Sequence, residues 1–285
     1  MYKVISLIIG MAFGCNAMAA PGETALDFLN LPVGATEAAL GHGNYAGYLG
    51  PEALFGNPAL IGSANGAFAS HQELLLDTRS EAAAAVLRLT SRFSLGVAMH
   101  FFSPGYIEGY SEDNTKTGGV DAGDRLIRVA VAKNGDISWG LAASFYNEKL
   151  ANRVGNGFGL GAGMSMQKGP GRFGANIDNL GPEFKVGESS TPLPTRYSLS
   201  AWVPIHNGFW NLNFDIAYIN GPGFLGSLGM EYIVLDGLAL RAGGNNQDPL
   251  SLGLGIKSGK LSFDYAYIPL SSFGDRHIIS ASFTK

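Results

Sequence analysis

The stretch WNLNFDIAYIN, from Trp210 to Asn220, alternates between two kinds of side chain. Successive side chains of an extended strand point to opposite faces, so the composition of each face follows directly from the sequence. One face would carry Trp210, Leu212, Phe214, Ile216 and Tyr218. The other would carry Asn211, Asn213, Asp215 and Ala217. Such a strand is typical of a sheet that separates an oily environment from an aqueous one.

The composition of the whole chain is consistent with such a sheet. The 285 residues carry a formal net charge of −4, and only 15% of them are charged, while 41 are glycine. Low charge, many glycines and 11% aromatic residues favour a β protein with many tight turns, or a membrane barrel. A pI of about 5.7 gives no electrostatic reason to expect nucleic acid as a partner.

Residues 1–20 have the pattern of a secretory signal peptide. Lys3 precedes an apolar run over residues 4–13, and Ala17-Met18-Ala19 predicts cleavage after Ala19 or Ala20. A lipoprotein acceptor at Cys15 is the alternative, although the residues before it fit a lipobox poorly. Cys15 is the only cysteine, so we expect neither a disulfide nor thiol chemistry in the mature chain. The rest of the sequence contains no run of about 18 apolar residues, so it predicts no transmembrane helix.

From residue 66 onward the period-2 pattern predicts about fourteen strands. They span residues 66–75, 79–90, 93–104, 124–133, 136–149, 154–168, 171–180, 194–204, 208–220, 224–234, 237–244, 249–257, 260–268 and 275–284. Every second connection is a short turn, such as Asn134-Gly135 or Asp236-Gly237, and those between them tend to be longer. This parity is typical of an up-and-down antiparallel barrel with short periplasmic turns and longer outer loops.

A transmembrane β-barrel over residues 66–285 is therefore the predicted fold, with a secreted β-sandwich as the alternative. The sandwich explains the alternation equally well, but it explains less well the aromatic residues on the apolar faces near the strand ends. The candidates for lipid-facing aromatic girdles are Trp139, Trp210, Tyr232, Tyr265, Tyr267 and Phe283. Closure into a barrel is required because unpaired backbone groups cannot face hydrocarbon.

Residues 21–65 do not alternate, and they show short helical patterns near 24–29 and 35–40 that Gly and Pro interrupt. A barrel of about fourteen strands is wide enough to hold a small plug. We therefore expect this segment, called the hatch below, to lie inside the barrel. The alternative is a periplasmic tail that packs below the barrel.

The hatch sequence resembles the N-terminal signature of the FadL superfamily of outer-membrane barrels, and most closely its PorV/PorQ-like branch. The resemblance rests on Phe28-Leu29, on Gly34-Ala35 with Gly41, and on Asn57-Pro58-Ala59. LPTRYSLSAWVP, GMEYIVLDGLALRAGGN and DYAYIPLSSFGDRHIISASF, in the last third of the chain, resemble the same branch. The resemblance implies the outer membrane of a Gram-negative-type (diderm) bacterium as the location, after signal cleavage. It also implies outer-membrane lipid and the barrel assembly machinery as partners.

Two positions depart from that family pattern. Thr36 and Glu37 stand where an Arg-Ala pair is common, which puts any role of that Arg in doubt. The chain ends Phe283-Thr284-Lys285, whereas such barrels usually end on an aromatic residue that resembles an assembly signal.

Alternation places a set of charged side chains of both signs toward the lumen. These are Arg172, Asp178, Arg196, Asp215, Glu231, Arg241, Lys257 and Asp264. We expect them to pair with the hatch, because an unpaired buried charge is costly; ion selectivity in an open pore is the alternative. By the family analogy, Asn57, Pro58 and Ala59 line a ligand path or hold the hatch shut. A plain Asn-Pro turn is the simpler interpretation.

No catalytic pattern stands out in the sequence. The five histidines match neither HExxH nor metal-ligand spacing, and we expect no cofactor and no metal. Ser280 and His277 are the nearest nucleophile and base, but a spacing of three on a strand places them on opposite faces. The glycine run Gly157–Gly163 lacks the following helix of a dinucleotide site. The chain is therefore not expected to be an enzyme.

Two functions follow from the resemblance. The first is binding or passage of a small hydrophobic solute across the outer membrane by hatch displacement or a lateral opening. The second is a scaffold or shuttle that docks cargo or components of a type IX-like secretion system. Of the two long loops, residues 105–123 are expected to be mobile and solvated, and Phe184 and Val186 of residues 181–194 could meet a solute or a protein.

Overall fold

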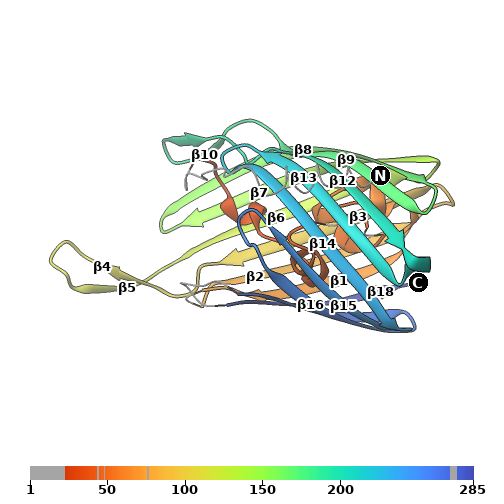
Figure 1. The fold of residues 1–285 in the computed structure, drawn as a ribbon. Helices are drawn as coiled ribbons and strands as arrows, with labels where there is room; N and C mark the ends of the chain where they lie inside the picture. The colour runs from red at the N-terminus through yellow and green to blue at the C-terminus, as the bar shows by residue number, and fades with distance from the viewer. Residues whose placement is uncertain (1–22, 44, 48, 76, 270–274) are drawn as a thin grey trace.

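The computed structural model describes residues 23–43, 45–47, 49–75, 77–269 and 275–285, so the expected signal peptide lies outside it. Within these residues fourteen antiparallel strands pair in a closed ring, in which β1 meets β18 and β8 meets β9. Figure 1 shows the resulting barrel with the short helical segments of the N-terminal part inside it. The predicted up-and-down barrel with an internal hatch is confirmed.

The strands of the barrel lie close to the predicted ranges. They are β1 (Gly66–Glu73), β2 (Arg79–Arg88), β3 (Phe93–Ser103), β6 (Ala122–Lys133), β7 (Ile137–Leu150), β8 (Arg153–Lys168), β9 (Gly171–Leu180), β12 (Arg196–Ile205), β13 (Trp210–Ile219), β14 (Gly223–Leu235), β15 (Leu238–Asn245), β16 (Ser251–Ser258), β17 (Leu261–Ile268) and β18 (Arg276–Thr284). A one-turn 3-10 helix, η4 (His206–Gly208), joins β12 to β13.

The two faces of β13 are divided as the alternation predicts. Asn211, Asn213 and Asp215 are buried inside the barrel, whereas Ile216 and Tyr218 are exposed on its outside. The same division recurs around the ring, so a band of exposed Leu, Ile, Val, Met and Phe side chains covers the outer wall. Within the described residues, no helix is both long and apolar enough to cross a membrane.

The six girdle candidates all have partly or largely exposed side chains on the outer face. Trp139, Trp210, Tyr232 and Phe283 lie toward the end of the barrel with the short turns and the C-terminus. Trp210 stacks on Tyr232 across the β13–β14 pair, with ring centroids 4.2 Å apart. Tyr265 and Tyr267 instead lie toward the long-loop end, where both rings contact His277.

The loops differ in detail from the sequence-based expectation. Residues 105–123 contain a hairpin of β4 (Ile107–Tyr110) and β5 (Lys116–Val120), which projects beyond the barrel (Figure 1). Residues 181–194 contain β10 (Phe184–Val186) and β11 (Ser189–Thr191), and β10 pairs with β8. Two connections at the long-loop end, residues 151–152 and 220–222, are tight turns, so the parity of loop length is only partial.

The hatch forms the core of the molecule together with the inner wall of the barrel. It contains η1 (Asp27–Asn30), α2 (Ala35–Ala39), η2 (Pro51–Phe55) and η3 (Pro58–Ser63). The largest apolar cluster joins Leu54, Leu60 and Ile61 of the hatch to small wall residues such as Ala98 and Ala130. Alanine at these inward positions leaves room for the hatch, which therefore fills the lumen as side chains fill an ordinary core.

Candidate functional site: the plugged lumen

Asn57-Pro58-Ala59 lies against the inner wall at β7 and β8. The Asn57 side chain is 0% exposed. Its Oδ1 caps η3 by accepting from Ala59 N at 3.0 Å, and its Nδ2 donates to the Met164 carbonyl at 3.1 Å. A Cβ at Gly163 would lie 2.0 Å from Asn57 Oδ1, and one at Gly140 would lie 2.5 Å from the Pro58 carbonyl. The motif thus combines a local turn with a close contact that holds the hatch to the wall.

Glu37, one of the two positions that depart from the family pattern, organises the polar part of the hatch. Its carboxylate accepts from Tyr45 Oη at 2.8 Å and from Val33 N at 3.1 Å, and His42 Nε2 lies 3.2 Å away. Burial alone would raise the pKa of Glu37, but these partners hold that pKa below its ordinary value. Burial lowers the pKa of His42, against the effect of Glu37. Glu37 is therefore the ionised acceptor of this cluster.

Three of the predicted lumen charges contact the hatch. Asp215 Oδ1 accepts from Tyr45 N at 3.2 Å. The Arg196 guanidinium lies over the Tyr45 ring, 4.6 Å from its centroid. Arg172 Nη1 donates to the Ala46 carbonyl at 3.1 Å. These contacts join one stretch of the hatch, residues 45–47, to three wall strands.

Three other predicted charges pair with one another along the wall. Arg241 Nε donates to Glu231 Oε2 at 2.7 Å, and its Nη1 donates to Asp264 Oδ1 at 2.6 Å. Asn211 Nδ2 supports Glu231 at 2.8 Å. Arg241 and Asp264 also act electrostatically on Glu52 of the hatch. The expected pairing with the hatch therefore stands beside a direct pairing within the wall. Lys257 is exposed at the open end of the lumen.

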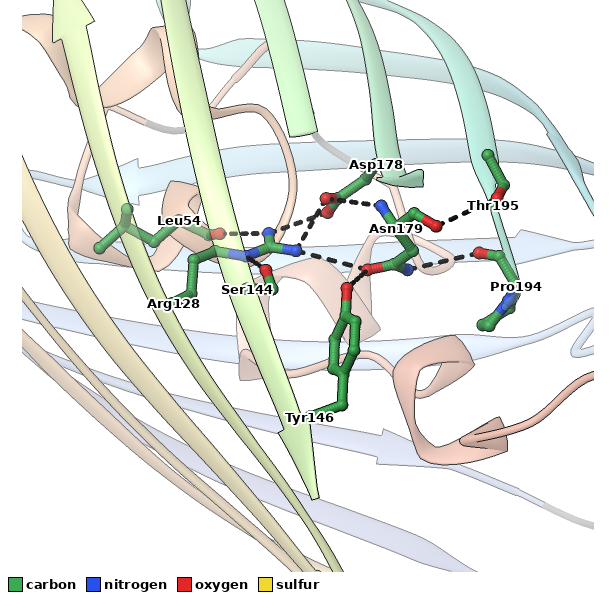
Figure 2. Close-up of polar contacts among 8 residues, drawn as sticks. All are labelled: Leu54, Arg128, Ser144, Tyr146, Asp178, Asn179, Pro194 and Thr195. Carbon is green, nitrogen blue, oxygen red and sulfur yellow. Dashed lines mark hydrogen bonds and ion pairs between the residues drawn. The ribbon is translucent and has the colours of Figure 1, made fainter. Parts of the chain in front are cut away.

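Asp178 also pairs with a wall residue, Arg128, which the alternation analysis did not identify. Figure 2 shows the pair: Arg128 Nη1 and Nη2 donate to the two oxygens of Asp178 at 2.8 and 2.7 Å. Arg128 is 2% exposed. Its Nε donates to Ser144 Oγ at 2.8 Å, and Nη1 also donates to the carbonyl of Leu54 in the hatch at 2.7 Å. One guanidinium therefore joins β6, β7, β9 and the hatch.

The Arg128 contacts lie at an irregularity in β9. The β8–β9 register shifts by one residue between Leu160 and Ala162, and Asn179 has a φ of 56° in the left-handed region. As a result Asp178 and Asn179, although consecutive, are both buried. Asn179 Oδ1 accepts from Tyr146 Oη at 2.9 Å, and Thr195 Oγ1 donates to the Asn179 carbonyl at 3.0 Å (Figure 2). Side chains thus compensate for backbone pairing that the bulge interrupts.

Arg128 was missed because both faces of its strand are apolar. Its inward neighbours include Leu126 and Ala130, and its outward neighbours are Ile127 and Val129. Period-2 analysis therefore gave no polar face on which to place it. The detectable signal was an isolated Arg within an apolar strand, since such a charge needs an inward partner.

Several cavities border the hatch. A cavity of about 390 Å³ opens between η2 and the wall formed by β14 to β18, and Glu52, Glu231, Arg241, Lys257 and Asp264 line it. Burial, with a smaller contribution from Asp264, raises the pKa of Glu52 to about 7. Another cavity, of about 30 Å³, has Tyr45, Arg196, Asp178 and Asn176 in its lining. That volume holds water but no organic solute.

An apolar groove of about 710 Å³ lies on the outer wall beside the bulge. Its sides include Trp139, Leu141, Met164, Leu199 and Phe224, and they alternate with small residues. Asn176 and Ser198 also line it, although both are buried and are joined by a hydrogen bond of 2.9 Å from Ser198 Oγ to Asn176 Oδ1. Asn176 therefore lines both the outer groove and the inner cavity.

The nearest candidate pair for catalysis is separated by the sheet. Ser280 is buried inward, where its Oγ accepts from Ala35 N at 3.2 Å, whereas His277 stacks with Tyr265 and Tyr267 outside. Among the described residues, no group of three or more His, Cys, Asp or Glu side chains is arranged to hold a metal ion.

No protein-family model matches the chain, and no curated protein matches it in sequence. Solved structures match it in fold at low identity. The Pseudomonas putida toluene transporter TodX aligns with a TM-score of 0.63 at 13% identity, over 88% of this chain and 97% of its own. A Pseudomonas aeruginosa FadL homologue gives 0.62 at 12% identity, over 89% and 98%. The Ralstonia pickettii toluene transporter TbuX gives 0.58 at 14%, over 90% and 99%. The chain therefore has the fold of the FadL-type barrels.

Proposed function

We propose that this protein is an outer-membrane channel that passes small hydrophobic solutes, with monoaromatic hydrocarbons as the first candidates. The apolar outer band supports insertion in a bilayer, and the polar, plugged lumen argues against free ion flow. The shared fold supports the substrate class, since two of the structures it resembles are toluene transporters.

The observation that carries the proposal is the position of Asn176 between the inner cavity and the outer groove. Transfer of a hydrophobic solute through a polar lumen to its far end gives little favourable free energy. Transfer through the wall beside Asn176 into the apolar groove that faces the membrane is more favourable for such a solute. The closed structure requires the hatch to move first, because the inner cavity of about 30 Å³ is too small for the solute.

The hatch contacts define a direct test. A Cβ at Gly43 would lie 3.3 Å from Ser227 Cβ, near the range of about 3.5–4.5 Å found in disulfides, and 2.6 Å from Asp215 Oδ2, which must shift. We expect cells that carry the Gly43→Cys/Ser227→Cys variant to take up labelled toluene slowly when the disulfide is oxidised. After reduction of the disulfide, the rate of uptake should be normal. Each single-cysteine variant under the same oxidant is the control. Equal uptake in the oxidised and reduced double variant, with the disulfide verified by mass spectrometry, would refute the hatch mechanism.

A docking role of the PorV/PorQ-like kind is the second candidate, and the β4–β5 hairpin favours it. Tyr106 beside the hairpin is 73% exposed, and Ile107 and Tyr110 are exposed as well. Phe184, by contrast, is buried against Gly155 and Gly157 and is not available to a partner. Replacing residues 107–120 with a short Gly-Ser linker should leave solute uptake unchanged. Co-purification of a stoichiometric protein that this replacement abolishes would favour docking over transport.

A further inference from the structure

The apolar band of the outer wall has a sharp upper boundary at the long-loop end. On β7 the outward positions Leu141, Ala143 and Phe145 are followed by Asn147 and Lys149. The neighbouring β6 changes in the same way, because its outward Ile127 is followed toward the long loops by Arg125, which lies opposite Asn147. Long loops of outer-membrane barrels face outward, so the change on these two strands marks the headgroup level of the outer leaflet.

A depression of about 610 Å³ lies at this boundary on the outer face of β2, β3, β6 and β7. Ser103 and Gly123 lie at its centre, and a Cβ at Gly123 would meet only the Phe102 carbonyl, at 2.9 Å. Arg79, Arg125 and Lys149 surround them, and all three side chains are exposed. Three cations therefore converge on a spot where small residues leave room for a ligand.

The cations differ in how far they are already neutralised. Lys149 pairs with Asp121, and both side chains of that pair are largely exposed. Glu81 on the rim lies 3.4 Å from His71. Arg79 and Arg125 have no side-chain partner among the described residues. Asp124 also lines the depression, from the half-buried inward position next to Arg125. Exposed pairs contribute little and exchange readily, so the guanidinium groups of Arg79 and Arg125 are the strongest sites for an anion.

We propose that this depression binds the phosphate of an outer-leaflet lipid, with the acyl chains lying down the apolar strip formed by Phe101, Met99 and Ile127. Guanidinium groups bind phosphate through paired N–H donors, and the two here lie at headgroup depth. Directly below Arg125, outward positions are apolar from Ile127 through Val131 on β6. A free phosphate ion would use the cations alone, whereas a lipid uses both features. The inference rests on the outer-membrane location and not on solute transport.

The test uses the purified full-length barrel washed in mild detergent, with bisphosphorylated lipopolysaccharide as the probe. We expect Arg79→Gln/Arg125→Gln to lower retention of this lipid, measured by native mass spectrometry, by about tenfold or more. Lys133→Gln/Lys168→Gln is the matched control, because it removes the same charge at the opposite edge of the band. Dephosphorylated lipid should bind equally weakly to all variants.

Three outcomes would overturn the proposal. These are equal lipid retention by wild type and the arginine double variant, equal loss in the lysine control, or full displacement of the lipid by millimolar inorganic phosphate. If the double variant fails to assemble, Arg125→Lys replaces it in the test. This variant keeps the positive charge but loses the paired N–H donors of the guanidinium group. A partial loss of retention in this variant, together with normal heat-modifiable migration, is then expected.

Discussion

Arg128 on β6 and Asp178 on β9 form a two-pronged ion pair across the inside of the barrel, although two strands, β7 and β8, lie between them in the wall. The same arginine holds the Leu54 carbonyl of the hatch. Barrel curvature and the β9 bulge bring these groups together. The pair therefore links the shape of the wall to the position of the plug.

Removing one partner of this pair should be costly. Arg128→Gln leaves Asp178 buried without its counter-charge, and we expect a loss of about 3–5 kcal/mol in the free energy of unfolding. Urea titration of the reconstituted barrel measures it. The double variant Arg128→Gln/Asp178→Asn should lose less than the sum of the two single variants. Additive losses would contradict the coupling.

The contact at Asn57 predicts a steric effect. Gly163→Ala places a methyl group 2.0 Å from Asn57 Oδ1, so the hatch must shift. We expect residues 23–65 of the folded barrel to be cleaved faster by a protease. N-terminal sequencing of the fragments identifies the cleavage sites. Asn57→Ala should partly rescue the variant by removing the clashing atom. Gly135→Ala, where a Cβ lies no closer than 3.4 Å to other atoms, is the control.

Glu52 predicts a pH dependence of hatch retention. Its pKa is about 7 in the closed barrel and returns toward 4.5 when the hatch leaves, so the closed state binds the proton more tightly. The stabilisation of the closed state is complete below about pH 4.5 and is lost as the pH rises through about 7. Protease protection of the hatch should therefore decrease between these values. Glu52→Gln should flatten the profile, and an unchanged profile would exclude Glu52 as the cause.

The outer band predicts a difference between two arginine substitutions. Leu199 is 66% exposed on the apolar outer face, and Arg there should cost about 2–4 kcal/mol near the bilayer midplane. Ser262→Arg, which faces the open cavity, should be tolerated. The heat-modifiable fraction after refolding into liposomes reports assembly. Asn213 is unsuitable as the inward control because it is 2% exposed.

The strands could be predicted from the sequence because period-2 alternation is a local property. The stretch from Trp210 to Asn220 already contains both environments of the wall, and the fourteen predicted ranges differ from the observed strands by only a few residues. The inward direction of Asp215 and Arg241 followed from the same rule.

The contacts of the lumen could not be predicted in this way, because they depend on which strands curve toward each other. Nothing local to Arg128 indicates Asp178, fifty residues away, and nothing local to Glu231 favours Arg241 over the hatch. The burial of Phe184 likewise depends on two distant glycines, Gly155 and Gly157. Such contacts between residues far apart in the sequence can be identified only once the arrangement of the strands in the closed barrel is known.

The packing of α2 has a consequence for the order of folding. Its buried alanines, Ala35, Ala38 and Ala39, cluster with Ala266, Ile268 and Ile278 of the last two strands. The first-made part of the mature chain thus has its apolar partners in the last-made part. We therefore expect α2 to take up its place only after β17 and β18 have formed, whereas η2 and η3 have their apolar partners in earlier strands. A chain interrupted before β18 would expose both an unpaired sheet edge and the apolar side of α2.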